Sequence, residues 1–481
     1  MRHDLILRGG TLFDGTGRER FAADLAVTDG KISAIGALGG DSAAREVDAK
    51  GLAVAPGFID AHTHDDRAVL GGAADMACKL SQGVTSVVIG NCGVSLSPVA
   101  FTERPPPPLE LLGADGWSFG SFAAYAERLS DAPPAVNVMA LIGHMPLRLE
   151  AMDGDVARAA SDREIARMRR RLDDALGEGA SGFSTGLWYP PNKAASEREV
   201  SAVGAALQAH GGLYCTHMRD EGPRVTDSIR ETLDAGRAMP APVVISHHKC
   251  NFPENYGRST ETLAQIDAAH AHQTVDFDVY PYNAGSTSLF PDVVREDVRV
   301  AITWSMPHPE QAGRDLREIA KGWGLPLREA AQRLLPAGAM YFMMDEGDVQ
   351  RILAHPRSMI GSDGIPHDLH PHPRLWGTFP RVLGHYAREL GLFSLETAIE
   401  KMTRRTAQVF GFEGRGVLAA GAHADLVLFD PATVIDTATF ADPIRPAAGI
   451  LETWVNGISA YTHGDGVSRT TAGRLVTRHR S

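Results

Sequence analysis

Apolar and polar residues alternate in short runs along both ends of the chain. Residues 1–54 contain DLILRGG and DLAVTDGKISAIG, and residues 416–481 contain ADLVLFDP and GILETWVNGISAYT. Gly and Asp-Gly separate the runs, as they separate the strands of antiparallel sheets. Neither end has enough strands to cover a core alone. The pattern therefore predicts one small β domain that is built from both ends of the chain.

The pattern changes between residues 55 and 415, where apolar runs alternate with helical segments such as DREIARMRRRLDDALGEGA. Eight of these runs have the composition of buried parallel strands. They begin at Leu52, Thr85, Val136, Ala180, Gly212, Pro242, Thr274 and Ser358. A succession of β-α units of this kind predicts a (β/α)8 barrel of the TIM type, with an open doubly wound sheet as the alternative.

A long excursion follows the seventh predicted strand, at about residues 285–345. Its later part has the apolar spacing of amphipathic helices. Segments of this length beyond a barrel strand usually cover or shape the active site, and we expect the same here.

Composition narrows the class of protein. Asp and Glu outnumber Lys and Arg by 59 to 47, which argues against nucleic acid or an anionic membrane surface as a partner. No apolar run is long enough to span a membrane, and the start of the chain has no signal-peptide pattern, so we expect a cytoplasmic protein. Four cysteines are too few for a disulfide scaffold. The sequence does not predict an oligomeric state.

Polar residues with metal-binding side chains stand at the carboxyl ends of five predicted strands. The barrel face formed by these ends carries the active site. A pair of histidines near a strand end is as often structural as ligating, and a lone cysteine is usually a small buried hydrophobe. The joint arrangement is harder to explain by packing. The residues are His62, His64, Cys92, His217, His247 and Asp363.

Cysteine and histidine together favour zinc among the common metals. Zinc activates a carbonyl and a water molecule, and Asp363 would take a proton from water and return it to a leaving nitrogen. The sequence therefore predicts hydrolysis at a carbonyl centre. Asp220 and Glu221, which follow His217, are expected to cap the next helix or to pair with a nearby basic group.

The sequence resembles a known family at several motifs: PGFIDAHTHDD, GNCG, THMRDEG, SHHK, DVYPY and GSDGIPHDLHPHPRLWGTFPRVLG. These are similar to the D-aminoacylase (N-acyl-D-amino-acid deacylase) branch of the amidohydrolase superfamily. The resemblance implies that a strand-two cysteine takes the metal-bridging role that a modified lysine has elsewhere. It implies a tight zinc at Cys92, His217 and His247. A second, weaker position would use His62, His64 and Asp363 and share Cys92.

The resemblance also implies that Lys249, Tyr280, Ser286 and Arg374 bind the free α-carboxylate of the substrate. Lys249 lies two residues beyond His247, on the same strand face. Arg374 follows Asp363 in a loop, where a guanidinium can hold a carboxylate with two hydrogen bonds.

Arg295, within the excursion, is the candidate for reading the side chain of the substrate. One group of the family acts on N-acyl-D-glutamate, and an extra arginine would pair with the second carboxylate of such a substrate. We expect this specificity slightly ahead of a broad one for N-acyl-D-amino acids or D-dipeptides. The alternative is a surface arginine that pairs with Glu296 and Asp297.

Two rival functions remain open. A cyclic amidase of the hydantoinase or dihydroorotase kind would need a bridging lysine, and the fourth predicted strand supplies none before Lys193. A catalytically inactive barrel would be expected to lack metal ligands, whereas this chain has the full set.

Overall fold

The computed structural model describes residues 2–113 and 115–479. Eight parallel strands form a barrel, and each coincides with a run that the sequence predicted, to within one residue at Val84, so the predicted fold class is confirmed. The residues of all eight strands are buried, as expected for strands that are covered on both faces. The strands are β6 (Phe58–Asp60), β7 (Val84–Ile89), β8 (Asn137–Gly143), β9 (Gly182–Gly186), β10 (Leu213–His217), β11 (Val243–Ile245), β12 (Val275–Val279) and β16 (Ser358–Ile360).

The barrel closes where the segment after β6 meets the segment after β16. The backbone N–H of Asp363 donates to the carbonyl of His62 at 2.8 Å, and that of His64 donates to Gly364 at 3.1 Å. These bonds bring the histidines that follow the first strand next to the aspartate that follows the last one.

We call this junction between the first and last barrel strands the seam. A buried lysine stabilises it. Lys79 lies in the short helix α1 (Ala77–Leu80), and its Nζ donates to Asp60 Oδ2 and to Ser362 Oγ, both at 2.7 Å. The other oxygen of Asp60 accepts from the backbone N–H groups of Ser362, at 2.8 Å, and of His62, at 3.2 Å. One carboxylate therefore holds the ends of the first and last strands together.

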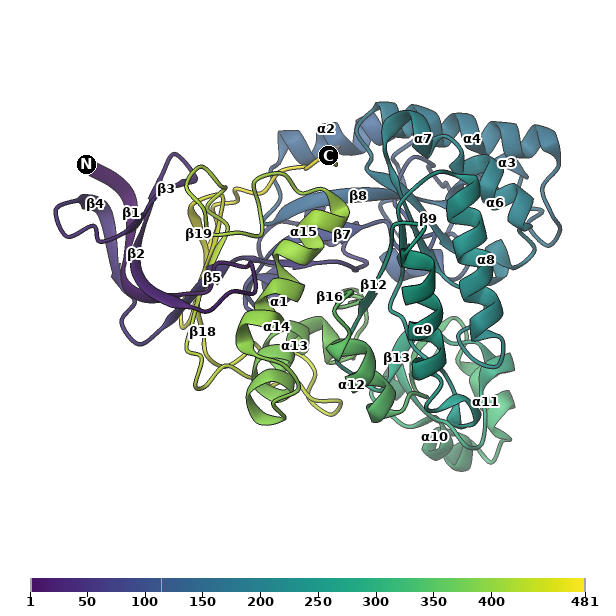
Figure 1. Cartoon of the computed structure of the whole chain (residues 1–481). Coiled ribbons are helices and arrows are strands. Elements are labelled where there is room, and N and C mark those ends of the chain that lie inside the picture. Colours follow the sequence, from purple (N-terminus) through teal and green to yellow (C-terminus); the bar gives the residue numbers. More distant parts are fainter. Residues whose placement is uncertain (1, 114, 480–481) are drawn as a thin grey trace.

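Helices cover the outside of the barrel (Figure 1). At the start of α4 (Asp162–Gly177), Ser161 and Glu164 form a capping box, and apolar residues at helical spacing face the core. The helices that follow the strands include α2 (Phe122–Asp131), α3 (His144–Ala151), α4 (Asp162–Gly177), α6 (Glu197–Gly204), α8 (Val225–Ala238), α9 (Ser259–His270), α12 (Glu346–Ala354), α13 (Arg374–Arg381), α14 (Leu395–Met402) and α15 (Arg404–Phe410). None of the helices in the described residues is long and apolar enough to cross a membrane.

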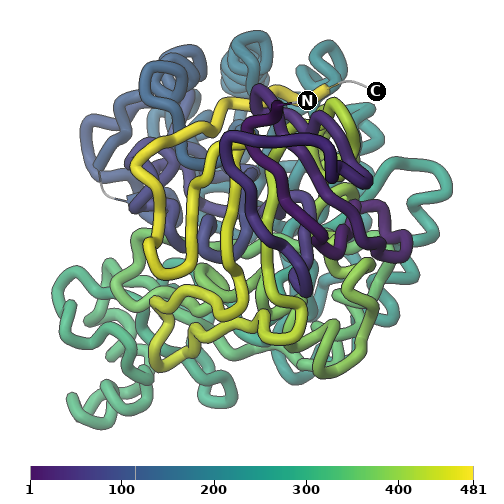
Figure 2. Tube along the Cα trace, turned by 90° about the vertical axis from the view of Figure 1, so that its left-hand side faces the viewer, coloured from purple at the N-terminus to yellow at the C-terminus, as the bar shows by residue number. Residues whose placement is uncertain are grey.

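The two ends of the chain share one nine-stranded sheet, and Figure 2 shows them side by side. The strands from the two ends meet where β5 (Ala53–Pro56) pairs antiparallel with β17 (Leu426–Phe429). The strands of this sheet are β1 (Arg2–Leu12), β2 (Phe21–Thr28), β3 (Lys31–Gly36), β4 (Ser42–Asp48), β5 (Ala53–Pro56), β17 (Leu426–Phe429), β18 (Ile450–Val455), β19 (Ile458–Thr462) and β20 (Gly466–Val467).

The first apolar run that the sequence assigned to the barrel, which begins at Leu52, forms two separate strands, β5 and β6. The chain leaves the nine-stranded sheet after Pro56 and enters the barrel at Phe58. A side chain at Gly57, between them, would lie 2.3 Å from Thr85, so this crossing needs glycine.

The excursion contains amphipathic helix, as the sequence predicted, in two segments, α10 (Leu316–Trp323) and α11 (Leu327–Leu334). It also contains three strands that were not predicted, β13 (Gly285–Ser288), β14 (Arg299–Ser305) and β15 (Ala337–Phe342), which form an antiparallel sheet. The helices pack on this sheet around a hydrophobic cluster of their own that includes Ile302, Ile319 and Leu334.

Replacing Lys79 with Met should strongly destabilise the fold. The variant leaves the buried carboxylate of Asp60 without its cation, which costs about 3–5 kcal/mol in comparable cases. The free energy of unfolding by denaturant in metal-free buffer measures this cost. Arg198→Met is the matched control, because its ion pair with Asp162 is exposed and should leave stability unchanged. Equal stability of the two variants would contradict the role given to Lys79.

Candidate active site

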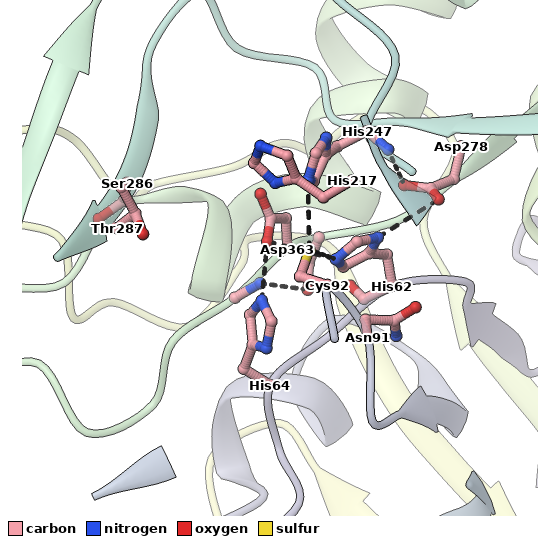
Figure 3. A network of polar contacts seen from close by, with 12 residues as sticks. His62, His64, Asn91, Cys92, His217, His247, Asp278, Ser286, Thr287 and Asp363 are labelled. Atoms are coloured by element: carbon pink, nitrogen blue, oxygen red, sulfur yellow. Dashed lines mark hydrogen bonds and ion pairs between the residues drawn. The ribbon is translucent and has the colours of Figure 1, made fainter. Parts of the chain in front are cut away.

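Six side chains from five strand ends meet at one end of the barrel (Figure 3). They form two groups with one shared member, and in each group one ligand atom per residue lies within 4.8 Å of the others. All of the side chains are buried. The groups are His62, His64, Cys92 and Asp363, and Cys92, His217 and His247.

Three of these residues have a backbone conformation that side chains other than glycine rarely adopt. The φ angles of Cys92, His247 and Asp363 are 56°, 37° and 50°. Such residues cost about 1–3 kcal/mol each and persist where neighbours hold them in place. His247 is held by its N–H, which donates to Asp278 Oδ1 at 2.9 Å.

The spacing and chemistry of the donors fit zinc. Cys92 Sγ lies 3.2 Å from His62 Nε2 and 3.3 Å from His247 Nε2. Sulfur and nitrogen ligands of one tetrahedral zinc are separated by about 3.5 Å. His217 Nδ1 is buried without a hydrogen-bond partner among the described residues, so a nitrogen at this centre is left without a protein partner.

The centre is strongly charged. Burial raises the pKa of the Cys92 thiol, but His62 and His247 outweigh it and hold this pKa well below its ordinary value. Burial likewise raises the pKa of Asp363, while Arg374 and His62 bring it well below the ordinary range. These shifts favour the thiolate of Cys92 and the carboxylate of Asp363, the forms that bind metal.

Sequence reasoning missed the contribution of Asp278. This residue of β12 places Oδ2 3.3 Å from His62 Nδ1, while Oδ1 accepts from the backbone of His247. It therefore orients two histidines that come from different strands. Asp276 and Asp278 share one face of the apolar strand VDFDV, and this was the available signal.

Glu221 pairs with basic groups, one of the two roles that the sequence suggested. Its carboxylate lies 2.8 Å from Lys249 Nζ and 3.1 Å from His247 Nδ1, and it accepts from Asn251 Nδ2 at 3.2 Å. Nδ1 of His247 also lies 2.6 Å from Lys249 Nζ, and Nε2 of His247 faces Cys92.

A cavity of about 100 Å³ opens beside this centre. Its walls come from the barrel strand ends and from the excursion, which contributes residues of β13 and β15. The residues that line it include Trp188, Tyr189, His217, Glu221, His247, Lys249, Phe252, Tyr280, Ser286, Thr287, Val293, Tyr341, Met343 and Asp363.

Three of the four residues expected to bind a substrate carboxylate, Lys249, Tyr280 and Ser286, line this cavity. The fourth, Arg374, lies one layer behind the wall and is 1% exposed. Its guanidinium carbon is 4.6 Å from the centre of the Tyr280 ring, and Nη1 lies 2.9 Å from Asp363 Oδ2.

Arg295 is not brought to the cavity. Its guanidinium pairs with Glu254 at 2.7 Å and with Asp297 at 2.6 Å, and its carbon lies over the Phe252 ring, 4.8 Å from the ring centre. The sequence left two roles open for Arg295. Its position agrees with the second role, that of a surface arginine paired with acidic side chains.

The fold and the site define a class: a (β/α)8-barrel enzyme with a buried cysteine–histidine–aspartate cluster that can hold metal at the active-site face. The chain belongs to the amidohydrolase family, whose model matches residues 45–461. The resemblance to the D-aminoacylase branch is confirmed by relatives that match over nearly the whole chain.

One relative is the D-aminoacylase of Alcaligenes xylosoxydans xylosoxydans, 53% identical over 99% of this chain and 98% of its own. Another is the N-acyl-D-glutamate deacylase of the same organism, 46% identical over 99% and 97%. A solved structure of N-acyl-D-glutamate deacylase from Bordetella bronchiseptica, with zinc and a phosphonate mimic of the tetrahedral intermediate, has a TM-score of 0.95 and 45% identity over 99% of this chain and 100% of that chain.

Replacing Asp278 with Asn should weaken zinc binding about 10- to 100-fold, because the support of two histidines is lost. Titration of the metal-free protein with zinc measures this change. Asp276→Asn is the control, since Asp276 lies on the same strand but pairs with Arg405 and has no contact with the cluster. Unchanged affinity in Asp278→Asn would show that Asp278 does not orient the histidines.

Proposed function

We propose that this protein hydrolyses N-acyl-D-amino acids in a zinc-dependent reaction and releases a carboxylate and the free D-amino acid. The observation that carries the proposal is the position of Cys92, which belongs to both groups of candidate ligands. The D configuration of the substrate comes from the relatives, whose names specify it.

Zinc would be held tightly by Cys92, His217 and His247. A weaker second position would use His62, His64 and Asp363, with Cys92 shared. When bound, zinc polarises a substrate carbonyl and lowers the pKa of a water molecule.

The protein residues supply the proton transfers. Asp363 takes a proton as the water oxygen adds to the amide carbon, and then delivers this proton to the amide nitrogen as the C–N bond breaks. Tyr280, whose side chain lines the cavity, donates a hydrogen bond to the oxygen that gains negative charge. The products are the carboxylate of the acyl group and the free amine.

Lys249, Ser286 and Arg374, together with Tyr280, would bind the α-carboxylate. Lys249, Tyr280 and Ser286 line the cavity and Arg374 lies against Tyr280, and a buried carboxylate requires such partners.

For the substrate side chain we propose a broad preference that includes apolar residues. Phe252, Val293, Tyr341 and Met343 form an apolar wall of the cavity. A preference for N-acyl-D-glutamate depends on Arg295, and both Glu254 and Asp297 already neutralise its charge.

The rival functions are less well supported. Lys193, the first lysine after the fourth strand, lies in α5 (Pro190–Lys193), is exposed and belongs to neither ligand group. A cyclic amidase would therefore lack its bridging lysine here. A catalytically inactive barrel would not be expected to keep all six candidate metal ligands close together.

Cys92→Ala should lose zinc, whereas His62→Ala should retain much of it and lose turnover, because Cys92 is shared by both positions and His62 serves only the weaker one. Zinc content by elemental analysis and hydrolysis of N-acetyl-D-methionine measure the two effects. Full zinc content in Cys92→Ala would overturn this division of roles.

The function itself is tested with N-formyl and N-acetyl derivatives of D- and L-amino acids on zinc-loaded protein, with a cyclic imide as the control for the rival activity. We expect hydrolysis of D substrates only. Arg295→Ala should change activity on N-acetyl-D-glutamate and on N-acetyl-D-methionine by the same factor, because Arg295 contacts Glu254 and Asp297. A loss confined to the glutamate substrate would restore the N-acyl-D-glutamate prediction.

A further inference from the structure

The carboxylate of Asp363 has both of its oxygens engaged. Oδ1 lies 3.2 Å from His64 Nε2 and 3.5 Å from His62 Nε2, within the metal-binding cluster. Oδ2 lies 2.9 Å from Nη1 of Arg374. In this arrangement no oxygen of the proposed base is left free to accept a proton from water.

Arg374, the partner of Asp363 Oδ2, leaves two of its nitrogen atoms without a hydrogen-bond acceptor among the described residues. Arg374 is 1% exposed, and its Nη2 donates to the backbone carbonyl of Ser286 at 3.1 Å. Its Nε and Nη1 make no hydrogen bond to any described residue, because the contact with Asp363 is close but poorly aligned. A guanidinium forms its strongest contacts as two parallel hydrogen bonds to one carboxylate, and Asp363 does not provide them.

Arg374 lies directly behind the surface where a substrate carboxylate would bind. Its guanidinium is stacked on Tyr280 and bonded to Ser286, and both of these residues line the cavity. A carboxylate between Lys249 and Tyr280 would therefore compete with Asp363 for the same guanidinium.

We propose that Arg374 locks Asp363 until the α-carboxylate of the substrate draws the guanidinium away, so that the substrate itself frees the base that hydrolyses it. The proposal rests on the proposed function, since it concerns the same substrate carboxylate. The exchange conserves charge, because Arg374 leaves one carboxylate for another and Asp363 keeps its contacts with the two histidines.

Lys249 provides the contrast. Its Nζ is also paired before substrate binds, but with Glu221 at 2.8 Å and with His247 Nδ1 at 2.6 Å, and neither residue is the proposed base. Loss of Lys249 should therefore weaken carboxylate binding without freeing Asp363. Loss of Arg374 should do both.

The test compares N-acetyl-D-leucine with N-(3-methylbutyl)acetamide, the same amide without the carboxylate, in zinc-loaded protein. We expect the wild type to hydrolyse the neutral amide slowly, and formate to accelerate this reaction about tenfold and saturably. Arg374→Met should hydrolyse N-acetyl-D-leucine more slowly but the neutral amide several-fold faster than the wild type, with no response to formate.

A residue that only binds the carboxylate would behave differently. Arg374→Met would then lower activity on N-acetyl-D-leucine alone, and formate would not accelerate the neutral amide; this result would overturn the lock. Lys249→Met is the matched control and should not speed hydrolysis of the neutral amide. Zinc content is measured for each variant, and Arg374→Gln replaces Arg374→Met if the latter does not fold or loses zinc.

A structure of the zinc-loaded wild type with formate tests the contact between Arg374 and Asp363 without any need for turnover. Its result can therefore be judged separately from the proposed function. We expect the distance from Nη1 to Asp363 Oδ2 to increase beyond about 4 Å, the limit of an ion pair. Formate bound near Tyr280 with that pair intact would contradict the lock. Absence of activity on every N-acyl-D-amino acid would instead contradict the proposed function.

Discussion

The seam between the first and last barrel strands is the constraint on which the site depends. Asp60 holds it from the first strand, and its two oxygens accept from Lys79, from Ser362 and from the backbone of His62. A carboxylate and an ammonium buried together are tolerated only when their hydrogen bonds are satisfied, and here they are. Because His62 and Asp363 stand just above this pair, any slip of the seam would separate the metal-binding groups.

Above the seam, the site is organised by pairing of opposite charges. The Cys92 sulfur lies between His62 and His247, Glu221 pairs with Lys249, and Arg374 pairs with Asp363. The chain carries a net charge of −12, yet it gathers buried cations where an anionic substrate would bind. Each of these cations has a carboxylate partner, so a substrate carboxylate that bound there, as proposed, would replace an existing interaction.

Much of this could be predicted from the sequence, because the signals were local. Apolar runs located all eight strands, and metal-binding side chains at their ends located the cluster. The split at Gly57 was missed because the two strands are separated by one residue. The strands of the excursion were missed because they are short, and β13 is the polar tetrapeptide GSTS.

Long-range contacts could not be predicted in this way. Asp60 and Ser362 are 302 residues apart, and His62 and Asp278 are 216 apart. Arg295 was expected to face the substrate, but its partner Glu254 lies 41 residues away along the chain. No pattern within either segment indicates that the two meet.

The site is divided between two kinds of support. The candidate metal ligands follow barrel strands and are held by backbone hydrogen bonds, whereas one wall of the cavity comes from an excursion with its own hydrophobic cluster. The polar contacts that join the two parts include Tyr189 with Thr287 at 3.0 Å and Arg374 with Ser286. Changes in the excursion can therefore alter which side chain the cavity accepts without moving the cluster. This separation is consistent with relatives that match over the whole chain yet are named for different D substrates.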